Sequence, residues 1–479
     1  MSSTSTSTLH SADDDVSSTY PKGTVVTRLD DQPLTMQLAE WVATTSVGQI
    51  PSEVRHQVRR VVVDYLAATV LGSQAESATI VREYRRRRDT DNSSTVIATD
   101  VRLSPEGAAL VNGTAAHALD VDDGYTPGGF HPSGPVVSAA FAAAEPLNSD
   151  ADQLVRAIAL GYEVACRLAG STHPQQRKRG FHNTPLAGVF GATTAVAALL
   201  DLDAAGTANA FGLAGSHAGG LLSFLDQGSD VKRYHAGKAA RDGLVSAELA
   251  GSGLAAPTTV LESAHGYLQA FTGGECDVDH LIGDLGTTWR MKRTYNKPYP
   301  CCRHLHGAVD AALQIREEQG LDPGSIEQVR VETFAIAADH DNINIDHLLD
   351  AQMSLPYAVA AALVHGQLGM VHFEDEARRD PQLTAILQTI KIAEDETMTR
   401  AYPAARPARV TITASGADHV AEVPQPLGEP DNPISDEALT TKFRHLAGPV
   451  LGARQVEAVL DAAWTLDDPA HLYNTLTGT

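Results

Sequence analysis

Cysteine is scarce in this chain, with four residues among 479, at positions 166, 276, 301 and 302. So few cysteines exclude a disulfide scaffold, and because no C-x-x-C spacing occurs, a zinc ribbon or an iron–sulfur ligand run is excluded as well. The chain also lacks a Walker A sequence, an H-E-x-x-H and a G-x-S-x-G motif. Their absence argues against a P-loop nucleotide enzyme, a zinc protease and an α/β-hydrolase.

Positive charge is also in short supply, because 36 basic side chains face 59 acidic ones and leave a formal net charge of −23. A surface of that sign repels phosphate backbones and anionic lipid, so we expect neither nucleic acid nor a membrane as a partner. The one long stretch without formal charge, residues 183–200, is rich in Ala, Gly and Thr. It is more typical of a helix buried inside the protein than of a membrane span.

The N-terminal segment is polar and has neither the basic and apolar regions of a secretory signal nor the arginines of a transit peptide. We therefore predict a disordered tail over residues 1–30 and a cytoplasmic protein.

The hydrophobic pattern predicts a mainly α protein, in which a large all-α domain is followed by a smaller α+β lid. Helical periodicity dominates from about residue 35 to residue 250, with Pro51-Ser52-Glu53 and Ser104-Pro105-Glu106 as helix starts. After Trp289 the texture changes, and alternating apolar and polar residues predict strands over 327–334, 409–413 and 419–423. Helices are expected between these strands, over 305–319, 357–365 and 381–392.

Two further helical patterns, over 438–446 and 455–463, end the chain. We expect these helices to rejoin the first domain. The predicted organisation is therefore an all-α domain formed by residues 31–290 and 429–479, with an α+β lid domain formed by residues 291–428.

Four clusters of polar residues could carry chemistry. They are the His- and Asp-rich loop 117–134, the basic turn 177–185, the cationic helix start 230–241 and the Pro-rich turn 297–306. Taken singly, each cluster also fits a plainer interpretation, such as a helix cap, a solvated turn or an exposed cationic helix start. The H-x-H of His304 and His306 has neither acidic neighbours nor a third local histidine, so we expect no metal site there.

In this order, the four clusters resemble the MmgE/PrpD family, which holds 2-methylcitrate dehydratases, cis-aconitate decarboxylase and iminodisuccinate epimerase. The resemblance is carried by HALDVDDGY and HPSGPVV, GFHNTPLAGVFGATTAVAALL, GSDVKRYHAGKAARDG, NKPYPCCRHLHGAVDAAL and DAQMSLPYAVAAAL. It implies a homodimer, an active site between the two domains, and neither a metal nor an organic cofactor. The implied substrate is a small-molecule di- or tricarboxylate.

The resemblance also implies a set of site residues. Five catalytic positions of the decarboxylase fall on Asp120, His131, His182, Lys232 and Lys297. A sixth, which is a histidine in the decarboxylase, falls on Cys302 here, and this departure disfavours cis-aconitate decarboxylation. For substrate binding we add Asp123, Arg233, Tyr299 and Arg303.

The expected function is that of a metal-independent lyase of the 2-methylcitrate dehydratase type. His182 or Lys232 would remove a proton next to a carboxylate, and His131, oriented by Asp120, would protonate the departing hydroxide. Cations would stabilise the enediolate between these steps. The alternative is an epimerase or isomerase of a small dicarboxylate, and two less favoured options are a cis-aconitate decarboxylase and a non-catalytic member that only binds an acid.

Overall fold

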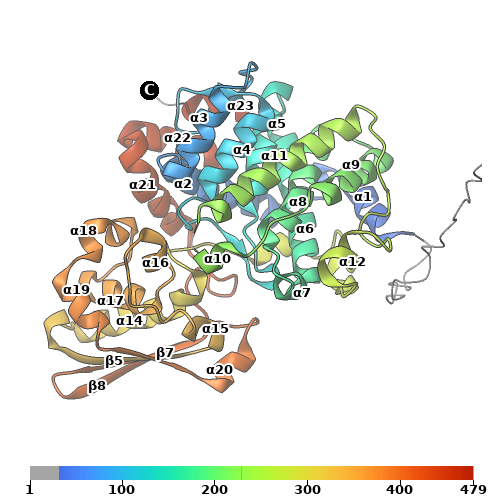
Figure 1. The fold of residues 1–479 in the computed structure, drawn as a ribbon. Helices are drawn as coiled ribbons and strands as arrows, with labels where there is room; N and C mark the ends of the chain where they lie inside the picture. The colour runs from blue at the N-terminus through green and yellow to red at the C-terminus, as the bar shows by residue number, and fades with distance from the viewer. Residues whose placement is uncertain (1–31, 228, 478–479) are drawn as a thin grey trace, which may run out of the picture.

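A computed structural model describes residues 32–227 and 229–477, so the predicted tail over residues 1–30 lies outside the described residues. The described chain is mainly helical and carries one small mixed sheet in its C-terminal region, which confirms the predicted fold class. Its buried apolar residues form two main clusters, one within a large helical body and one within a smaller body that we call the lid (Figure 1).

The helical body is built from the first thirteen α-helices and the last three. Their bounds are α1 (Leu34–Thr44), α2 (Ser52–Gly72), α3 (Glu76–Arg86), α4 (Pro105–Ala116), α5 (Ser133–Leu147), α6 (Ala151–Thr172), α7 (Gln175–Lys178), α8 (Asn183–Leu199), α9 (Ala204–His217), α10 (Phe224–Gln227), α11 (Val231–Gly251), α12 (Tyr267–Thr272), α13 (Val278–Ile282), α21 (Asp436–Leu451), α22 (Ala453–Thr465) and α23 (Pro469–Thr475). Two pairs of two-residue strands accompany them: β1 (Ser94–Thr95) with β2 (Arg102–Leu103), and β3 (Gly124–Tyr125) with β4 (Thr294–Tyr295).

Small residues let the central helices approach closely. A Cβ atom on Gly237 of α11 would lie 2.2 Å from the carbonyl oxygen of Leu110 in α4, and one on Gly113 would lie 2.7 Å from the Cα atom of Gly237. Backbones can meet at such distances only where no side chain intervenes. The richness in Ala and Gly therefore serves tight helix packing, and α8 is buried at every position, as predicted for this uncharged segment.

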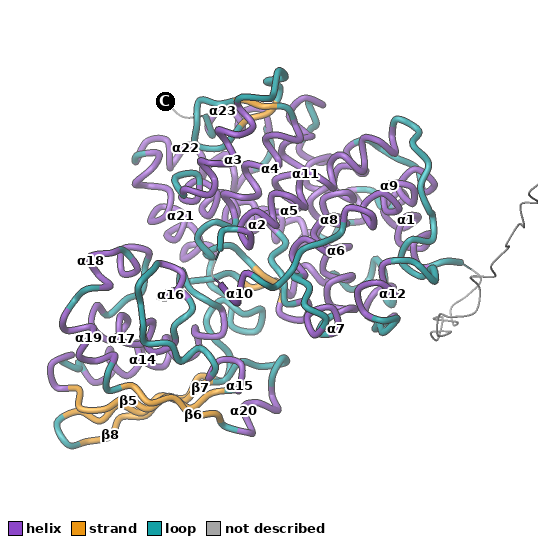
Figure 2. Tube along the Cα trace, viewed as in Figure 1, coloured by secondary structure: helices purple, strands orange, loops and turns teal. Residues whose placement is uncertain are grey.

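The lid contains α14 to α20 and a four-stranded sheet. Its elements are α14 (His306–Gln319), β5 (Ile326–Thr333), α15 (Ala335–Ala338), α16 (Leu348–Gln352), α17 (Leu355–His365), α18 (Asp375–Arg378), α19 (Pro381–Leu387), β6 (Ile390–Glu394), α20 (Glu396–Ala401), β7 (Ala408–Ala414) and β8 (Ala417–Val423). The strand order is β6-β5-β7-β8, with β5 and β6 parallel and the other pairs antiparallel. Figure 2 shows α14, α17 and α19 together on one side of this sheet.

One expected helix is wrong in its second half. The helical pattern over 381–392 predicted a single helix, but α19 ends at Leu387 and Ile390 begins strand β6. Leu383, Ile386, Leu387 and Ile390 are all buried at helical spacing, so the periodicity continues past the end of the helix. Parallel pairing of β6 with β5 overrides it.

The chain crosses between the two bodies twice, and the crossings lie side by side. The backbone N–H of Asn296 donates to the carbonyl oxygen of Gly428 over 3.1 Å. Beyond the second crossing, α21 packs against α2, and Leu439 and Phe443 join the larger core. Figure 1 shows these last helices, in red, against the helical body. Within the described residues, no helix combines the length and apolar character needed to cross a membrane.

Candidate active site

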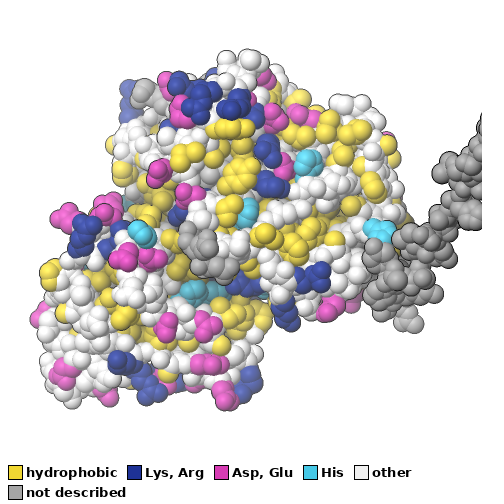
Figure 3. Space-filling view, viewed as in Figure 1, with side chains coloured by type: hydrophobic (Ala, Val, Ile, Leu, Met, Phe, Trp, Pro, Cys, Tyr) yellow, Lys and Arg dark blue, Asp and Glu magenta, His cyan; other side chains and the backbone are white. Residues whose placement is uncertain are grey.

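A narrow cavity of about 10 Å³ lies between the helical body and the lid. The helical body contributes most of its walls and α16 of the lid contributes the rest; the lining residues are His117, Ala118, Asp120, Ser229, Lys232, Arg233, Leu349 and Gln352. Figure 3 shows histidine and basic side chains reaching the surface along the junction of the two bodies. A volume of this size holds about one water molecule, which is less than a multi-carbon acid requires.

Asp120 is clamped by two lysines at one wall of this cavity. It follows α4 in the left-handed backbone conformation, with φ of 59°, which an aspartate tolerates better than most residues. Its Oδ1 lies 2.5 Å from Nζ of Lys232, in the first turn of α11, and its Oδ2 lies 2.9 Å from Nζ of Lys297, just beyond β4. Lys297 also donates to the Asp120 carbonyl oxygen over 2.9 Å.

The clamp fixes the charges of its members. Burial alone would raise the pKa of Asp120, but the ammonium groups of Lys232 and Lys297 outweigh it and hold that pKa below its ordinary value. Burial likewise opposes the charge of Lys297, yet Asp120 raises the pKa of this lysine above its ordinary value. The two cations exceed the single anion, so the clamp keeps a positive excess that suits a substrate carboxylate.

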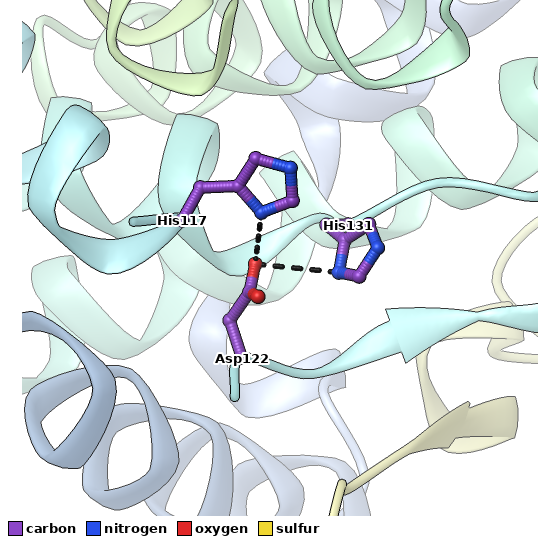
Figure 4. A group of neighbouring side chains, drawn as sticks. All are labelled: His117, Asp122 and His131. Atoms are coloured by element: carbon purple, nitrogen blue, oxygen red, sulfur yellow. Dashed lines mark hydrogen bonds and ion pairs between the residues drawn. The ribbon is translucent and has the colours of Figure 1, made fainter. Parts of the chain in front are cut away.

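Asp122 joins two histidines in a second buried group (Figure 4). Its Oδ2 lies 2.8 Å from Nδ1 of His117 and 3.3 Å from Nδ1 of His131. The His131 Nδ1 also lies 2.8 Å from the carbonyl oxygen of Asp123. The expectation that Asp120 orients His131 is therefore wrong, because the two lysines occupy Asp120 and Asp122 takes that role.

These contacts determine the tautomers of both rings. Carboxylate and carbonyl oxygens only accept hydrogen bonds, so the Nδ1 of His117 and of His131 each carry the proton. The Nε2 atoms are then left with a lone pair for a proton, and the Nε2 of His117 is buried without a partner. Burial lowers the pKa of His117 to about 4. Burial alone would raise the pKa of Asp122, but His117 and His131 outweigh it and hold that pKa well below its ordinary value.

The same three residues form a group in which a metal ion could be held, because one ligand atom from each lies within 4.8 Å of the others. Two imidazoles and one carboxylate are a donor set that zinc accepts. In the structure the Nδ1 protons already satisfy the Asp122 oxygen, and a metal would have to displace them. Two buried atoms of the group, Nε2 of His117 and Oδ1 of Asp122, have no hydrogen-bond partner among the described residues.

His182 lies next to this group at the start of α8, and it pairs with a further histidine of α11. Its Nδ1 lies 3.0 Å from Nδ1 of His235, and its ring centroid lies 6.3 Å from that of His117. Burial, together with the neighbouring His235 and His117, lowers the pKa of His182 well below its ordinary value. Both rings of the pair are thus neutral near pH 7, with one Nδ1 donating and the other accepting.

Asp123, predicted to bind substrate, points into the helical body. Its carboxylate accepts from the backbone N–H of Ser133 over 3.2 Å and from the hydroxyl of Tyr162 over 3.0 Å. Burial and the nearby carboxylate of Asp64 raise the pKa of Asp123 to about 7. Asp123 therefore meets His131 through its own backbone carbonyl oxygen, and it is not among the residues that line the cavity.

The remaining binding candidates are distributed over both bodies. Arg233 lines the cavity and donates to the carbonyl oxygen of Ala118 over 2.6 Å, while the Tyr299 hydroxyl donates to Asp310 over 2.6 Å. The Arg303 guanidinium is buried and pairs with Glu429 over 3.0 Å, and Arg406 shares the same carboxylate over 2.8 Å. The Arg303 guanidinium therefore pairs with a carboxylate of the protein itself, next to the chain crossing at Gly428.

Cys302 lies on the lid side, next to the cavity wall. Its backbone N–H donates to the Gln352 carbonyl oxygen over 2.8 Å, and the Gln352 amide donates to the carbonyl oxygens of Leu119 and Pro300 over 2.7 and 3.0 Å. Gln352 thus bridges the loop before Asp120 and the turn that carries Cys302. Its neighbour Cys301 is fully buried in the lid core.

Sequence reasoning missed several residues of this region as functional candidates: His117, His235, His340, Gln352, Arg406 and Glu429. His117 and His235 lie inside the first and third clusters, so their chemistry was visible, but only the fold shows which carboxylate or imidazole each one meets. Gln352 lies in DAQMSLPY, one of the family-like segments.

Comparison with known proteins matches both halves of the chain to one family. The MmgE/PrpD N-terminal domain matches residues 36–278 and the MmgE/PrpD C-terminal domain matches residues 299–467. A cis-aconitate decarboxylase-like protein of Aspergillus oryzae is 25% identical, over 95% of this chain and 98% of its own length. Cis-aconitate decarboxylases of Aspergillus terreus and Homo sapiens are each 26% identical, over 91% of this chain and 93% and 92% of their own lengths. With two family domains matched in order over most of its length, the chain belongs to the MmgE/PrpD family.

Proposed function

We propose that the protein is a metal-independent lyase that removes water from a di- or tricarboxylate, as a 2-methylcitrate dehydratase does. The observation that supports it most is the Lys232–Asp120–Lys297 clamp beside the His117–Asp122–His131 group at one interdomain cavity. A cationic wall would bind the carboxylates, and the imidazoles would take and give the protons. A non-catalytic acid-binding protein has no need of the second group.

The chemistry divides into two steps. The neutral imidazole of His182 takes the proton from the carbon next to a carboxylate, and the electron pair left behind spreads into that carboxylate as an enediolate. Lys232 and Lys297 stabilise the added negative charge at short range in a dry site. As the C–O bond breaks, the imidazolium form of His131, whose Nδ1–H is held by Asp122, gives its Nε2 proton to the departing hydroxide. The products are an alkene, water and a neutral His131 ring.

Decarboxylation is the second candidate, because the relatives described above carry the name cis-aconitate decarboxylase. The same cationic wall would serve that reaction, but cleavage would fall on a C–C bond and the proton would be added to the carbanion. Cys302 stands where the resemblance places a histidine of the decarboxylase, and for this reason we rank dehydration first. We also propose that the protein is a homodimer, which light scattering of the purified protein would test. Its proposed location is the cytoplasm.

The discriminating experiment is proton NMR of the protein in D₂O with 2-methylcitrate, citrate, cis-aconitate and iminodisuccinate. Growth of an alkene signal with loss of the hydroxy acid would support dehydration. Evolution of carbon dioxide from cis-aconitate would contradict dehydration and indicate decarboxylation. Deuterium uptake with inversion but without an alkene would contradict dehydration and indicate epimerisation. If none of the acids changes, the proposed substrate class is wrong.

Chelation is expected to leave this activity unchanged. The Nδ1 atoms of His117 and His131 already lie against Asp122, and the lysines supply the positive charge that a metal would otherwise bring. Turnover after dialysis against EDTA should therefore equal that of the untreated protein within about 20%, and added Zn²⁺ should not increase it. Loss of turnover in EDTA, restored by one metal, would contradict the metal-free mechanism and assign the ion to these three residues.

A further inference from the structure

The turn that carries Cys302 brings its thiol next to a histidine that no motif indicated. The Cys302 Sγ lies 3.7 Å from Nε2 of His340, which follows α15 in the lid. The backbone of His340 is tied in place because its carbonyl oxygen accepts from the N–H of Leu355 over 2.8 Å. Thiol and imidazole thus meet on rigid parts of the lid, beside Gln352 of the cavity wall.

We propose that His340 holds Cys302 as a thiolate, which makes Cys302 a proton-transfer group and an electrophile-reactive site in the lid, next to the cavity wall at Gln352. The proton-transfer role of Cys302 rests on the proposed function. The reactivity of its thiolate toward electrophiles does not, since it needs no substrate. His340 is then a positioning residue that acts through Cys302.

The charges around the pair support a thiolate. Burial and Asp120, across the cavity, both disfavour it, yet the imidazolium of His340 and the backbone of His304 outweigh them and lower the pKa of Cys302 to about 7. Burial lowers the pKa of His340, but Cys302, the backbone of Met353 and Asp339 raise it above its ordinary value. The His304 ring lies 5.9 Å from that of His340, and burial and nearby cations lower its own pKa, so it stays neutral.

The other three cysteines provide an internal contrast. Burial raises the pKa of Cys276 to about 11, and burial raises those of Cys166 and Cys301 well above the ordinary value. Cys166 and Cys301 are also fully buried, whereas Cys302 is only half-buried. A thiol reacts as the thiolate, so Cys302 should be the one that reacts quickly at neutral pH.

The proton transfer is balanced without any co-reactant. When the substrate reacts on the face toward the lid, Cys302 acts in place of His182: the C–H bond next to the carboxylate breaks, the proton forms the S–H bond of Cys302, and the electron pair stays on the substrate as the enediolate. In the return direction the thiol gives the proton back. Because His182 acts from the helical body and Cys302 from the lid, the two can address opposite faces of one carbon, which epimerisation requires and dehydration does not.

The test is the pH dependence of alkylation of the whole protein by iodoacetamide, followed for each cysteine by peptide mass spectrometry. We expect Cys302 to be labelled with a midpoint near pH 7. In His340→Gln the midpoint should move toward about 8.5, and labelling at pH 7 should slow about tenfold. The matched control is His419→Gln, a substitution on strand β8 of the same lid, which should label as the wild type does.

Two results would overturn the proposal: a wild-type midpoint at or above 8.5, or a His340→Gln protein whose labelling matches the wild type at every pH. Circular dichroism of His340→Gln establishes that the variant is folded, and His340→Lys offers a second variant that keeps a cation near the thiol and should retain a lowered midpoint. The proposed function is judged separately, because labelling uses no substrate acid. Alkylation as predicted with silence across the acid panel would refute only the substrate class.

Discussion

Asp122→Asn is expected to reduce kcat about 10²- to 10⁴-fold while leaving the fold intact. Oδ2 of Asp122 contacts Nδ1 of both His117 and His131, so an asparagine can keep both contacts through its one oxygen. The amide carries no charge, however, and neither ring then has a negative partner when it becomes an imidazolium. Losing the carboxylate that supports an acid–base histidine costs rates of this order.

Steady-state kinetics on the acid identified by NMR would measure the effect, with circular dichroism to establish folding. Asp284→Asn is the matched control, because Asp284 pairs with Arg167 and Arg290 away from the cavity. It should keep kcat within about twofold. A kcat of Asp122→Asn equal to that of the control would remove His131 from the role of the acid.

Lys297→Met is expected to destabilise the protein by about 3 kcal/mol, the lower end of the cost of breaking a buried ion pair. The lysine side chain is 1% exposed, and its removal leaves Asp120 with Lys232 alone and the Asp120 carbonyl without its donor. Urea unfolding followed by circular dichroism would give the change in the free energy of unfolding. The double variant Asp120→Asn with Lys297→Met should recover part of the loss, since it removes the charge left behind.

The pH dependence of this loss follows from the two pKa shifts. The lowered pKa of Asp120 contributes stability above the ordinary carboxyl value near 4 and loses it as the pH falls further. The raised pKa of Lys297 contributes stability below its ordinary value near 10.4 and loses it as the pH rises beyond. The difference between wild type and Lys297→Met should therefore be largest between about pH 5 and 9, and a difference at about pH 11.5 equal to that at pH 7 would contradict the ion pair as its cause.

The helical body was largely predictable because its helices carry local sequence signals. The Pro-Ser-Glu and Ser-Pro-Glu starts and the long Ala- and Gly-rich periods predicted α2, α4 and α8 close to where they lie. The lid was less predictable. Its strands β5, β7 and β8 show alternation, but β6 follows a helix whose apolar spacing runs straight into it, and only pairing with β5 turns Ile390–Glu394 into a strand.

The sequence predicted a set of candidate site residues but not the contacts that they make. The family-like segments named Asp120, Lys232 and Lys297, yet Asp120 and Lys232 are 112 positions apart and only the packing of α4 and α11 brings them together. Family resemblance gave no reason to prefer Asp122 over Asp120 as the partner of His131. His340 lies in a loop of the lid without a motif, so its contact with Cys302 had no signal in the sequence.

The meeting of Gly113 and Gly237 has a consequence beyond helix packing. Asp120 lies four residues past the end of α4 and Lys232 lies in the first turn of α11, so the separation of these two helix axes sets the reach between carboxylate and ammonium. A methyl group at either glycine would meet backbone atoms at less than 3 Å and would spread the axes apart. Two residues without side chains, buried where the helices cross, thereby set the length of the Asp120–Lys232 contact on which the proposed mechanism depends.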